Sequence, residues 1–142
     1  WAQTAVDDYL ARFPRDFTVI VKEVKAEART GGKPVAQVMA AEAERIERAV
    51  PAGDILVAMD EHGRDMTTVD FAKKISGWKN EGCGVTFIIG GADGLDPALK
   101  AKSRMMLRLS SMTLPHAFAR VLLTEQIYRA WSILANHPYH RV

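Results

Sequence analysis

The spacing of apolar residues predicts helices and a strand in the first third of the chain. Residues 5–13 carry apolar side chains at helical spacing, and Pro14 then favours a break. The next segment, "FTVIVKEV" at residues 17–24, is rich in β-branched residues and partly alternates, so it predicts a strand. After a polar loop with a glycine pair, residues 34–50 show an apolar stripe at helical spacing and begin with Pro34, a residue favoured in a first helical turn. They predict a second helix.

Three further apolar runs predict strands, each followed by a helix. Residues 55–59 form a short buried run that ends at the acidic loop "DEHGRD". A helix is expected over residues 68–79, where Thr67 offers an N-terminal cap. The other two runs lie in "VTFIIGGADGL" and "RMMLRLSS". The first precedes a short helix at residues 97–103, and the second precedes a long helix at about residues 115–135.

Strands that alternate with helices of these lengths predict a single α/β domain over residues 1–142. Parallel strands joined by right-handed helical crossovers form an open, mostly parallel sheet with helices on both faces. Ligands of such sheets bind outside the carboxyl ends of the strands. Three strand ends are chemically distinctive here: "AMDEHG", "IIGGADG" and "LSSMTLPH". They lie side by side if their strands are neighbours, and they are the candidate ligand loops.

Composition narrows the class of protein. The chain has 142 residues, of which 48% are hydrophobic and 25% charged, as suits one well-formed core. It has no apolar run long enough to span a membrane and no signal-peptide pattern, so we expect a soluble, cytoplasmic protein that does not bind membranes. Cys83 is the only cysteine, which excludes an internal disulfide. With four scattered histidines, we expect no metal site.

Charge is distributed unevenly along the chain, although the formal net charge is only +2. Residues 97–142 contain seven Lys and Arg and a single acidic residue, Glu125, whereas residues 1–96 contain 12 basic and 16 acidic residues. Lys and Arg that displace counterions from phosphates provide affinity that does not depend on sequence. The C-terminal third therefore favours a polyanionic partner, and the alternative is an ordinary solvated surface.

The first two strand ends each allow a functional and a structural interpretation. Gly90, Gly91 and Gly94 follow an apolar strand and precede a capped helix, an arrangement that can hold a nucleoside with peptide groups or can simply form a tight turn. It is neither the G-x-G-x-x-G fingerprint nor a P-loop. Asp60 stands where a carboxylate can bind ribose hydroxyls, and it can equally be a turn-forming residue.

The third strand end and the C-terminal tail offer polar groups before and after the last helix. His116, at the end of "LSSMTLPH", can act as a general base, a phosphate contact or a hydrogen-bonding group of the helix terminus. Glu125 and Arg129 lie four residues apart on the helix and can be no more than a surface pair. The tail "NHPYHRV" combines residues that can stack on a base and contact phosphate, unless it is frayed as termini often are.

Three long motifs, "FIIGGADGL", "LSSMTLPHAFARVLLTEQIYRAWSI" and "NHPYHRV", in this order and spacing, resemble the RlmH-type family of the SPOUT superfamily. The resemblance covers nearly the whole chain and is densest over residues 85–141. Members of this family use S-adenosylmethionine to methylate a pseudouridine of large-subunit (23S) ribosomal RNA at ring nitrogen 3. The resemblance implies a deep trefoil knot near the C-terminus, which the rules for common folds do not predict.

The resemblance also implies site residues and a homodimer whose cofactor site lies close to the partner subunit. Contacts with S-adenosylmethionine, mainly from the backbone in the third loop, carry over to Met59, Gly90, Leu109, Ser110, Ser111, Met112, Thr113 and Leu114. We expect the catalytic residues to be His116, Glu125, Arg129, His140 and Arg141. Arg129, His140 and Arg141 are expected to bind or polarise the pseudouridine and its phosphates, and His116 and Glu125 are the candidates for a base or an orienting residue.

The chain departs from the family pattern in one respect. Members usually begin with a strand of the type hydrophobic-x-V-G-K, and we expect this domain to lack that native first strand. Because no separate RNA-binding domain is visible, we expect the assembled ribosome to be the substrate. The alternatives are a non-catalytic RNA-binding factor that associates with ribosomes and a nucleotide-dependent oxidoreductase, which the absence of G-x-G-x-x-G disfavours.

Overall fold

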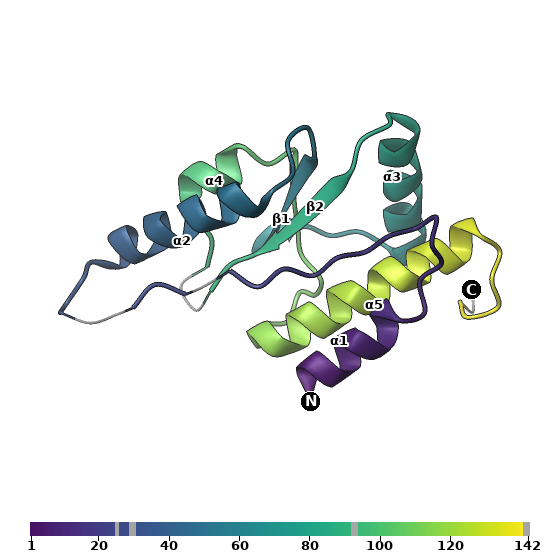
Figure 1. The fold of residues 1–142 in the computed structure, drawn as a ribbon, viewed down its shortest axis with the longest axis horizontal. Helices are drawn as coiled ribbons and strands as arrows, with labels where there is room; N and C mark the ends of the chain where they lie inside the picture. The colour runs from purple at the N-terminus through teal and green to yellow at the C-terminus, as the bar shows by residue number, and fades with distance from the viewer. Residues whose placement is uncertain (25, 29–30, 92–93, 141–142) are drawn as a thin grey trace. The chain divides into compact units, whose positions relative to one another are not determined.

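A computed structural model describes residues 1–142 except residues 25, 29, 30, 92, 93, 141 and 142 (Figure 1). The elements follow one another in this order: α1 (Ala2–Leu10), α2 (Val35–Ala49), β1 (Ile55–Arg64), α3 (Thr68–Asn80), β2 (Val85–Ile89), α4 (Pro97–Ala101), β3 (Met105–Leu107) and α5 (His116–Leu134). They form two compact units. The sheet unit comprises Lys22–Arg64 and Cys83–Arg108, and the helical unit comprises Trp1–Val21, Asp65–Gly82 and Leu109–Val142. In the part of the chain that is described, no helix has the length and apolar character needed to cross a membrane.

The sheet unit contains a three-stranded sheet with β1 in the centre. Its strand order is β2-β1-β3, and β1 pairs in parallel with both neighbours. Met59 of β1 is the register partner of Ile89 on one side and of Leu107 on the other. The predicted α/β class with parallel strands is therefore confirmed, and residues 59, 89 and 107 lie at the same end of the sheet.

The core of the sheet unit forms where α2 and α4 pack on one face of the sheet. Ala43 of α2 and Leu99 of α4 belong to the same buried cluster as Ala58 and Ile88, which are register partners in β1 and β2. Val57, on the opposite face of the sheet, also has no exposed surface. Burial on both faces explains why the first half of β1 reads as a nearly continuous apolar run rather than as an alternating one.

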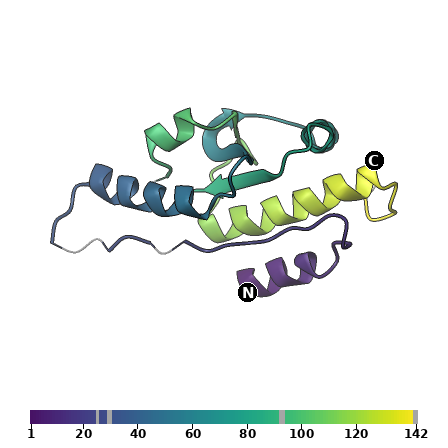
Figure 2. The same ribbon diagram turned by 45° about the horizontal axis from the view of Figure 1, so that its top comes forward.

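The helical unit is organised around α5, against which both α1 and α3 pack. The two views show α1 running beside α5 (Figures 1 and 2). The predicted cap of α3 is present, because Thr67 Oγ1 accepts a hydrogen bond from the backbone N–H of Asp70 at 3.1 Å. The first helix ends at Leu10, three residues earlier than its apolar pattern indicated, and Val6 is its fully buried residue.

Two predictions about strands are wrong. Residues 17–24 form no strand, and no described strand pairs with them. Their β-branched composition favours extended backbone, but a strand requires a neighbour for its peptide groups. The acidic segment predicted as a loop instead continues β1 to Arg64, with an irregular register against β3. Gly63 permits this close approach, since a Cβ there would lie 2.7 Å from the backbone carbon of Leu107.

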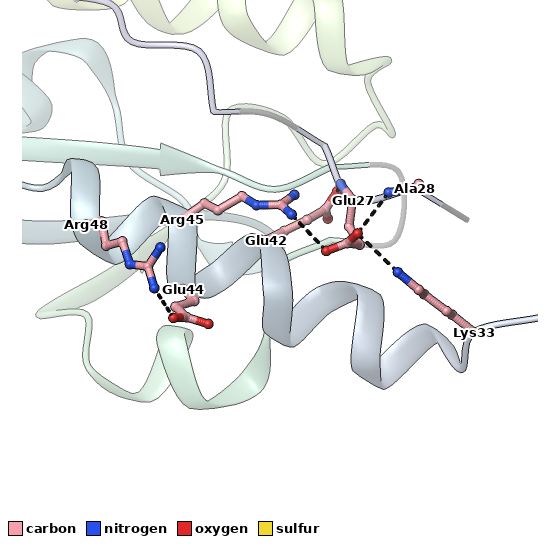
Figure 3. Close-up of polar contacts among 7 residues, drawn as sticks. All are labelled: Glu27, Ala28, Lys33, Glu42, Glu44, Arg45 and Arg48. Atoms are coloured by element: carbon pink, nitrogen blue, oxygen red, sulfur yellow. Dashed lines mark hydrogen bonds and ion pairs between the residues drawn. The ribbon is translucent and has the colours of Figure 1, made fainter. Parts of the chain in front are cut away.

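A charged cluster fastens the segment before α2 onto that helix (Figure 3). The Glu27 carboxylate contacts Arg45 Nη2 at 2.9 Å and Lys33 Nζ at 3.2 Å. The backbone N–H of Glu27 donates to Glu42 Oε2 at 3.2 Å. The hydrogen bond from Lys33, reinforced by the charge of Arg45, lowers the pKa of Glu27 below its ordinary value. The sequence alone gave no reason to pair these residues.

Candidate active site

The two strand ends in the sheet unit bring Met59 and Gly90 close to each other in the sheet. Met59 pairs with Ile89, the residue before Gly90. A Cβ at Gly90 would lie 2.5 Å from the backbone carbon of Gly94, and Gly94 itself has a positive φ of 84°. The tight-turn interpretation therefore accounts for these glycines by itself. Whether the loop also holds a ligand stays a prediction.

Asp60 lies within β1 and not in a turn. One of its carboxylate oxygens, Oδ1, is 3.8 Å from Lys100 Nζ on α4, and the Asp60 side chain is 16% exposed. Its place at the ligand end of the sheet agrees with the ribose-binding interpretation, but the contact with Lys100 is a competing structural role. At 3.8 Å this contact is an ion pair and not a hydrogen bond, so both interpretations of Asp60 remain open.

The third candidate loop is the irregular segment Leu109–Leu114, which begins two residues after β3 ends. Ser110 Oγ accepts a hydrogen bond from the backbone N–H of Met112 at 2.9 Å, so this hydroxyl shapes the loop. The side chain of Met112 is 76% exposed. Pro115 then caps α5, whose first backbone N–H groups have no partners within the helix. The loop therefore presents peptide groups and a flexible apolar side chain to its surroundings.

At the other end of α5, the chain turns back because of Asn136. This residue has a positive φ of 55°, the left-handed conformation that Asn adopts more readily than most residues. The backbone N–H of His137 donates to the carbonyl of Ser132 at 2.7 Å, and that of Asn136 to the carbonyl of Ile133 at 3.2 Å. This pair of bonds is the Schellman motif, which ends a helix and reverses the chain. It directs the tail alongside α5, so the described part of the tail is not frayed.

The reversed tail meets Glu125 and Arg129, and with them it forms what we call the tail group: Glu125, Arg129, Tyr139 and His140. The carboxylate oxygen Glu125 Oε1 accepts hydrogen bonds from Arg129 Nε at 2.8 Å and from the Tyr139 hydroxyl at 3.1 Å. The Arg129 guanidinium also lies 5.0 Å from the centre of the Tyr139 ring. Glu125 and Arg129 are thus more than an exposed surface pair, because their side chains are 12% and 32% exposed.

Further contacts tie the tail group to α1 and α3. The hydroxyl of Tyr9 lies 3.1 Å from that of Tyr139. Tyr139 uses its single proton towards Glu125, so Tyr9 is the donor in this contact. On the other side, Gln126 Nε2 donates to Glu125 Oε2 at 2.8 Å, and Thr68 Oγ1 donates to Gln126 Oε1 at 2.8 Å. Both carboxylate oxygens of Glu125 are therefore engaged.

These contacts shift the pKa values of two members of the tail group, Arg129 and Tyr139. The hydrogen bond to Glu125 raises the pKa of Arg129, which remains a cation. Burial, followed by the contacts with Tyr9 and Glu125, raises the pKa of Tyr139 well above its ordinary value. Tyr139 is a neutral phenol at physiological pH and acts as a donor. The arrangement presents one oriented guanidinium, held by a carboxylate whose two oxygens both accept hydrogen bonds.

The other predicted catalytic residues are placed differently. His116 is the exposed first residue of α5. With a rise of 1.5 Å per residue, it lies about 20 Å along the helix from Arg129. His140 joins the tail group through a contact of 3.2 Å between its Nδ1 and Ser132 Oγ. Arg141 lies outside the described residues. One chain therefore brings together three of the five predicted residues.

The basic C-terminal third does not form one surface of one unit. Lys100, Lys102, Arg104 and Arg108 belong to the sheet unit, whereas Arg120 and Arg129 belong to the helical unit. In the ranges that the structure describes, no three His, Cys, Asp or Glu side chains form a group that could hold a metal ion.

Sequence reasoning missed Tyr9, Thr68 and Asn136. Asn136 had a usable signal, because Asn followed shortly by Pro is typical of a helix end. Tyr9 had none, since it meets Tyr139 across 130 residues of sequence.

Comparisons with known proteins identify the family of the chain. The model of a family described as predicted SPOUT methyltransferase matches residues 1–140. A protein of Bordetella avium (strain 197N) named "Ribosomal RNA large subunit methyltransferase H" is 56% identical over 99% of this chain and 90% of its own length. Proteins of the same name from Ralstonia pickettii (strain 12J) and Burkholderia cenocepacia are each 54% identical, over 100% and 99% of this chain and 91% and 90% of their own lengths.

These matches confirm the resemblance found in the sequence and the expectation of an enzyme, and they leave the non-catalytic alternative without support. The chain belongs to the SPOUT methyltransferase family.

Proposed function

We propose that this protein transfers a methyl group from S-adenosylmethionine to ring nitrogen 3 of a pseudouridine in large-subunit ribosomal RNA, in the cytoplasm. The names of its relatives support the class of substrate. The observation that carries the proposal is the tail group, in which Glu125 and Tyr139 hold the partly exposed cation of Arg129. An oriented guanidinium suits a planar base with two carbonyl oxygens and an adjacent phosphate.

We assign the cofactor to the strand ends and the loop Leu109–Leu114. When bound, S-adenosylmethionine supplies an electrophilic methyl group on a sulfonium. The residues fit this group, because an irregular loop offers the backbone donors and acceptors that adenine requires, and the exposed thioether of Met112 is an adaptable apolar contact. Met59 and Gly90 contribute from the sheet. The deep trefoil knot of SPOUT proteins is part of this proposal.

On the substrate side, Arg129 stabilises the negative charge that spreads onto the carbonyl oxygens as nitrogen 3 loses its proton. Glu125 acts as the orienting residue, since both of its oxygens are engaged by donors. Arg141 is assigned to phosphate contact. In a displacement with a good leaving group, the protein mainly holds the two reactants together and stabilises the developing charge.

The separation along α5 supports a homodimer with a shared active site. The loop Leu109–Leu114 precedes the start of α5, whereas the tail group lies about 20 Å further along that helix. This separation favours a site in which the loop of one chain and the tail group of a second chain contact the two reactants. The helical unit also exposes a pair of aromatic rings in a tilted contact, Trp1 and Phe118, whose centres are 4.8 Å apart. Trp1 is 70% exposed and Phe118 is 50% exposed. Large apolar side chains that are exposed in a single chain are suited to be covered by a second copy of the chain.

The proposal is tested by incubating the purified protein and labelled S-adenosylmethionine with large ribosomal subunits, assembled ribosomes and naked ribosomal RNA. We expect methylation of assembled ribosomes in preference to naked RNA, and mass spectrometry of the digested RNA should identify an N3-methylated pseudouridine. Methylation at another atom or another nucleotide would contradict the assignment, as would no transfer to any of these RNAs.

A further inference from the structure

Ser132 makes two hydrogen bonds that together fix the position of one proton. It lies on α5 and is fully buried. Its hydroxyl donates to the backbone carbonyl of Arg129 at 2.7 Å. The same oxygen lies 3.2 Å from Nδ1 of His140.

The number of available protons decides which residue donates in the contact between Ser132 and His140. A serine hydroxyl has a single hydrogen, and the carbonyl of Arg129 takes it because a carbonyl cannot donate. The contact with His140 is then satisfied only if Nδ1 carries a proton and donates it to Ser132 Oγ. In the neutral imidazole, Nε2 is therefore the unprotonated nitrogen. In the opposite tautomer, the lone pair on Nδ1 of His140 would face a lone pair on the buried Oγ of Ser132.

Three other titratable groups of the helical unit, Glu125, Tyr139 and His116, are less suited to take a proton from the base. Glu125 already accepts hydrogen bonds at both oxygens. Tyr139 is itself a proton donor to Glu125. His116 lies about 20 Å from Arg129 along α5 and is therefore remote from the tail group. His140 differs from all three, because its Nδ1 donates to Ser132 and, within the described part of the chain, no hydrogen bond engages its Nε2.

We propose that Nε2 of His140 accepts the proton from nitrogen 3 of the pseudouridine, and that Ser132 is a positioning residue that maintains the required tautomer. The inference rests on the function proposed above. The proton leaves nitrogen 3 for Nε2, the electron pair that it leaves behind forms the bond to the methyl carbon, and the pair of the breaking bond stays on the sulfur of S-adenosylmethionine. The imidazolium that results keeps its Nδ1–H bond to Ser132 and returns the extra proton to water.

The tautomer can be measured without substrate or cofactor, by two-bond ¹H–¹⁵N correlation spectra of the protein labelled with ¹⁵N. At a pH where His140 is neutral, we expect it to carry its proton on Nδ1. His137 is an internal control with the opposite geometry, because its Nδ1 accepts a hydrogen bond from the backbone N–H of Tyr139 at 3.1 Å. It should carry its proton on Nε2. A spectrum in which His140 carries its proton on Nε2 overturns the proposal.

Activity provides the second arm of the test. We expect His140→Gln to lower kcat for methylation about 100-fold, and Ser132→Ala to lower it about tenfold while the KM for S-adenosylmethionine stays within about twofold. The double variant should be no slower than His140→Gln alone, because Ser132 acts only through His140. Ser132→Thr, which retains a hydroxyl, should recover both the rate and the Nδ1–H tautomer. Losses that multiply in the double variant would contradict the role of Ser132.

The failure of this inference can be distinguished from the failure of the proposed function. If the wild-type protein methylates no ribosomal RNA, the proposed function is wrong, and with it the role of His140 as a base. If the wild-type protein is active and His140→Gln retains its full rate, only the present inference is wrong.

Discussion

The end of the sheet that carries Met59 and Gly90 differs from the tail group in the kind of atoms that make the close contacts. At the sheet, the close contacts are between backbone atoms, as where Gly90 meets Gly94. In the tail group they are between side chains, from Tyr9 through Tyr139 and Glu125 to Arg129. A backbone site tolerates changes of polarity but no added volume, whereas a side-chain site is sensitive to the loss of one polar atom. The two regions should therefore respond to opposite kinds of substitution.

Arg129→Ala should give the largest effect on catalysis. It removes the only cation shown in the tail group and leaves Glu125, which is mostly buried, without its charge partner. We expect methylation to slow by at least about 100-fold, or about 3 kcal/mol, with little change in the affinity for S-adenosylmethionine measured by calorimetry. Arg129→Lys should not restore the rate, because lysine cannot donate from two nitrogens in a planar fork. Full activity of the lysine variant would show that charge alone is sufficient.

Gly90→Ala should reveal the sensitivity of the sheet end to volume. The added Cβ would come within 2.7 Å of three backbone atoms of residues 94 and 95, so we expect the free energy of unfolding to fall by about 1–3 kcal/mol and cofactor affinity to fall at least tenfold. Gly77→Ala is the matched control, since a Cβ there meets nothing within 4 Å in the middle of α3. That control should raise stability by about 0.5–1 kcal/mol in urea denaturation. If Gly90→Ala and Gly77→Ala change the free energy of unfolding in the same direction, the proposed sensitivity of the sheet end to added volume is wrong.

Asn136 offers a test of how the tail is directed. Asn136→Val should cost about 1–2 kcal/mol in the left-handed conformation and release the tail, whereas Asn136→Gly should retain it. Hydrogen exchange of residues 137–140 reports the release directly, and it should rise in the valine variant alone. Equal exchange in both variants would mean that the tail does not depend on this turn.

Tyr9→Phe should give a smaller, purely polar effect. The variant keeps the ring that lies 5.9 Å from Tyr128 but loses the hydroxyl that donates to Tyr139. We expect methylation to slow by about fivefold, or roughly 1 kcal/mol. Tyr9→Leu should slow it further, since the ring contacts are lost as well. An unchanged methylation rate for Tyr9→Phe would show that Tyr9 contributes only through the packing of its ring.

The smallest effect is expected at the charged cluster on α2, outside both regions. The folded state lowers the pKa of Glu27 below its ordinary value of 4.5, so this carboxylate stabilises the fold above that pH and the stabilisation is lost as the pH falls through the lowered value. Glu27→Gln should therefore be less stable than the wild-type protein at pH 7 and equally stable at about pH 2. Glu44→Gln, which removes an exposed pair with Arg48, is the control and should change little at either pH. A constant difference between Glu27→Gln and wild type across this range would exclude a charge effect.

The two regions also differ in how far the sequence could predict them. The ligand end of the sheet follows from local patterns, since apolar runs predicted all three strands and glycines predicted the turn after β2. The extension of β1 to Arg64 escaped prediction because it depends on the approach of Gly63 to β3, a contact between distant residues. The strand predicted at residues 17–24 failed for the same kind of reason, because pairing partners are not encoded locally.

In the tail group, the sequence supplied candidates but not their arrangement. It identified Glu125, Arg129 and His140, yet it gave Glu125 and His116 equal standing as candidate bases. The helical rise separates these two by about 13 Å, and only the turn at Asn136 brings His140 to the side of α5. Side-chain sites assembled from several helices depend on such long-range geometry, which no local pattern records.

The central claim is that each active site combines the cofactor loops of one chain with the tail group of another. It is tested most directly by mixing two impaired variants, Gly90→Ala and Arg129→Ala, under conditions in which subunits exchange and at a concentration of S-adenosylmethionine too low to occupy the Gly90→Ala site. One site of each mixed dimer then carries both substitutions and the other carries neither, so equal amounts should recover about one quarter of the wild-type methylation rate. If mixed dimers form and no activity returns, both halves of the site belong to the same chain and the account is wrong.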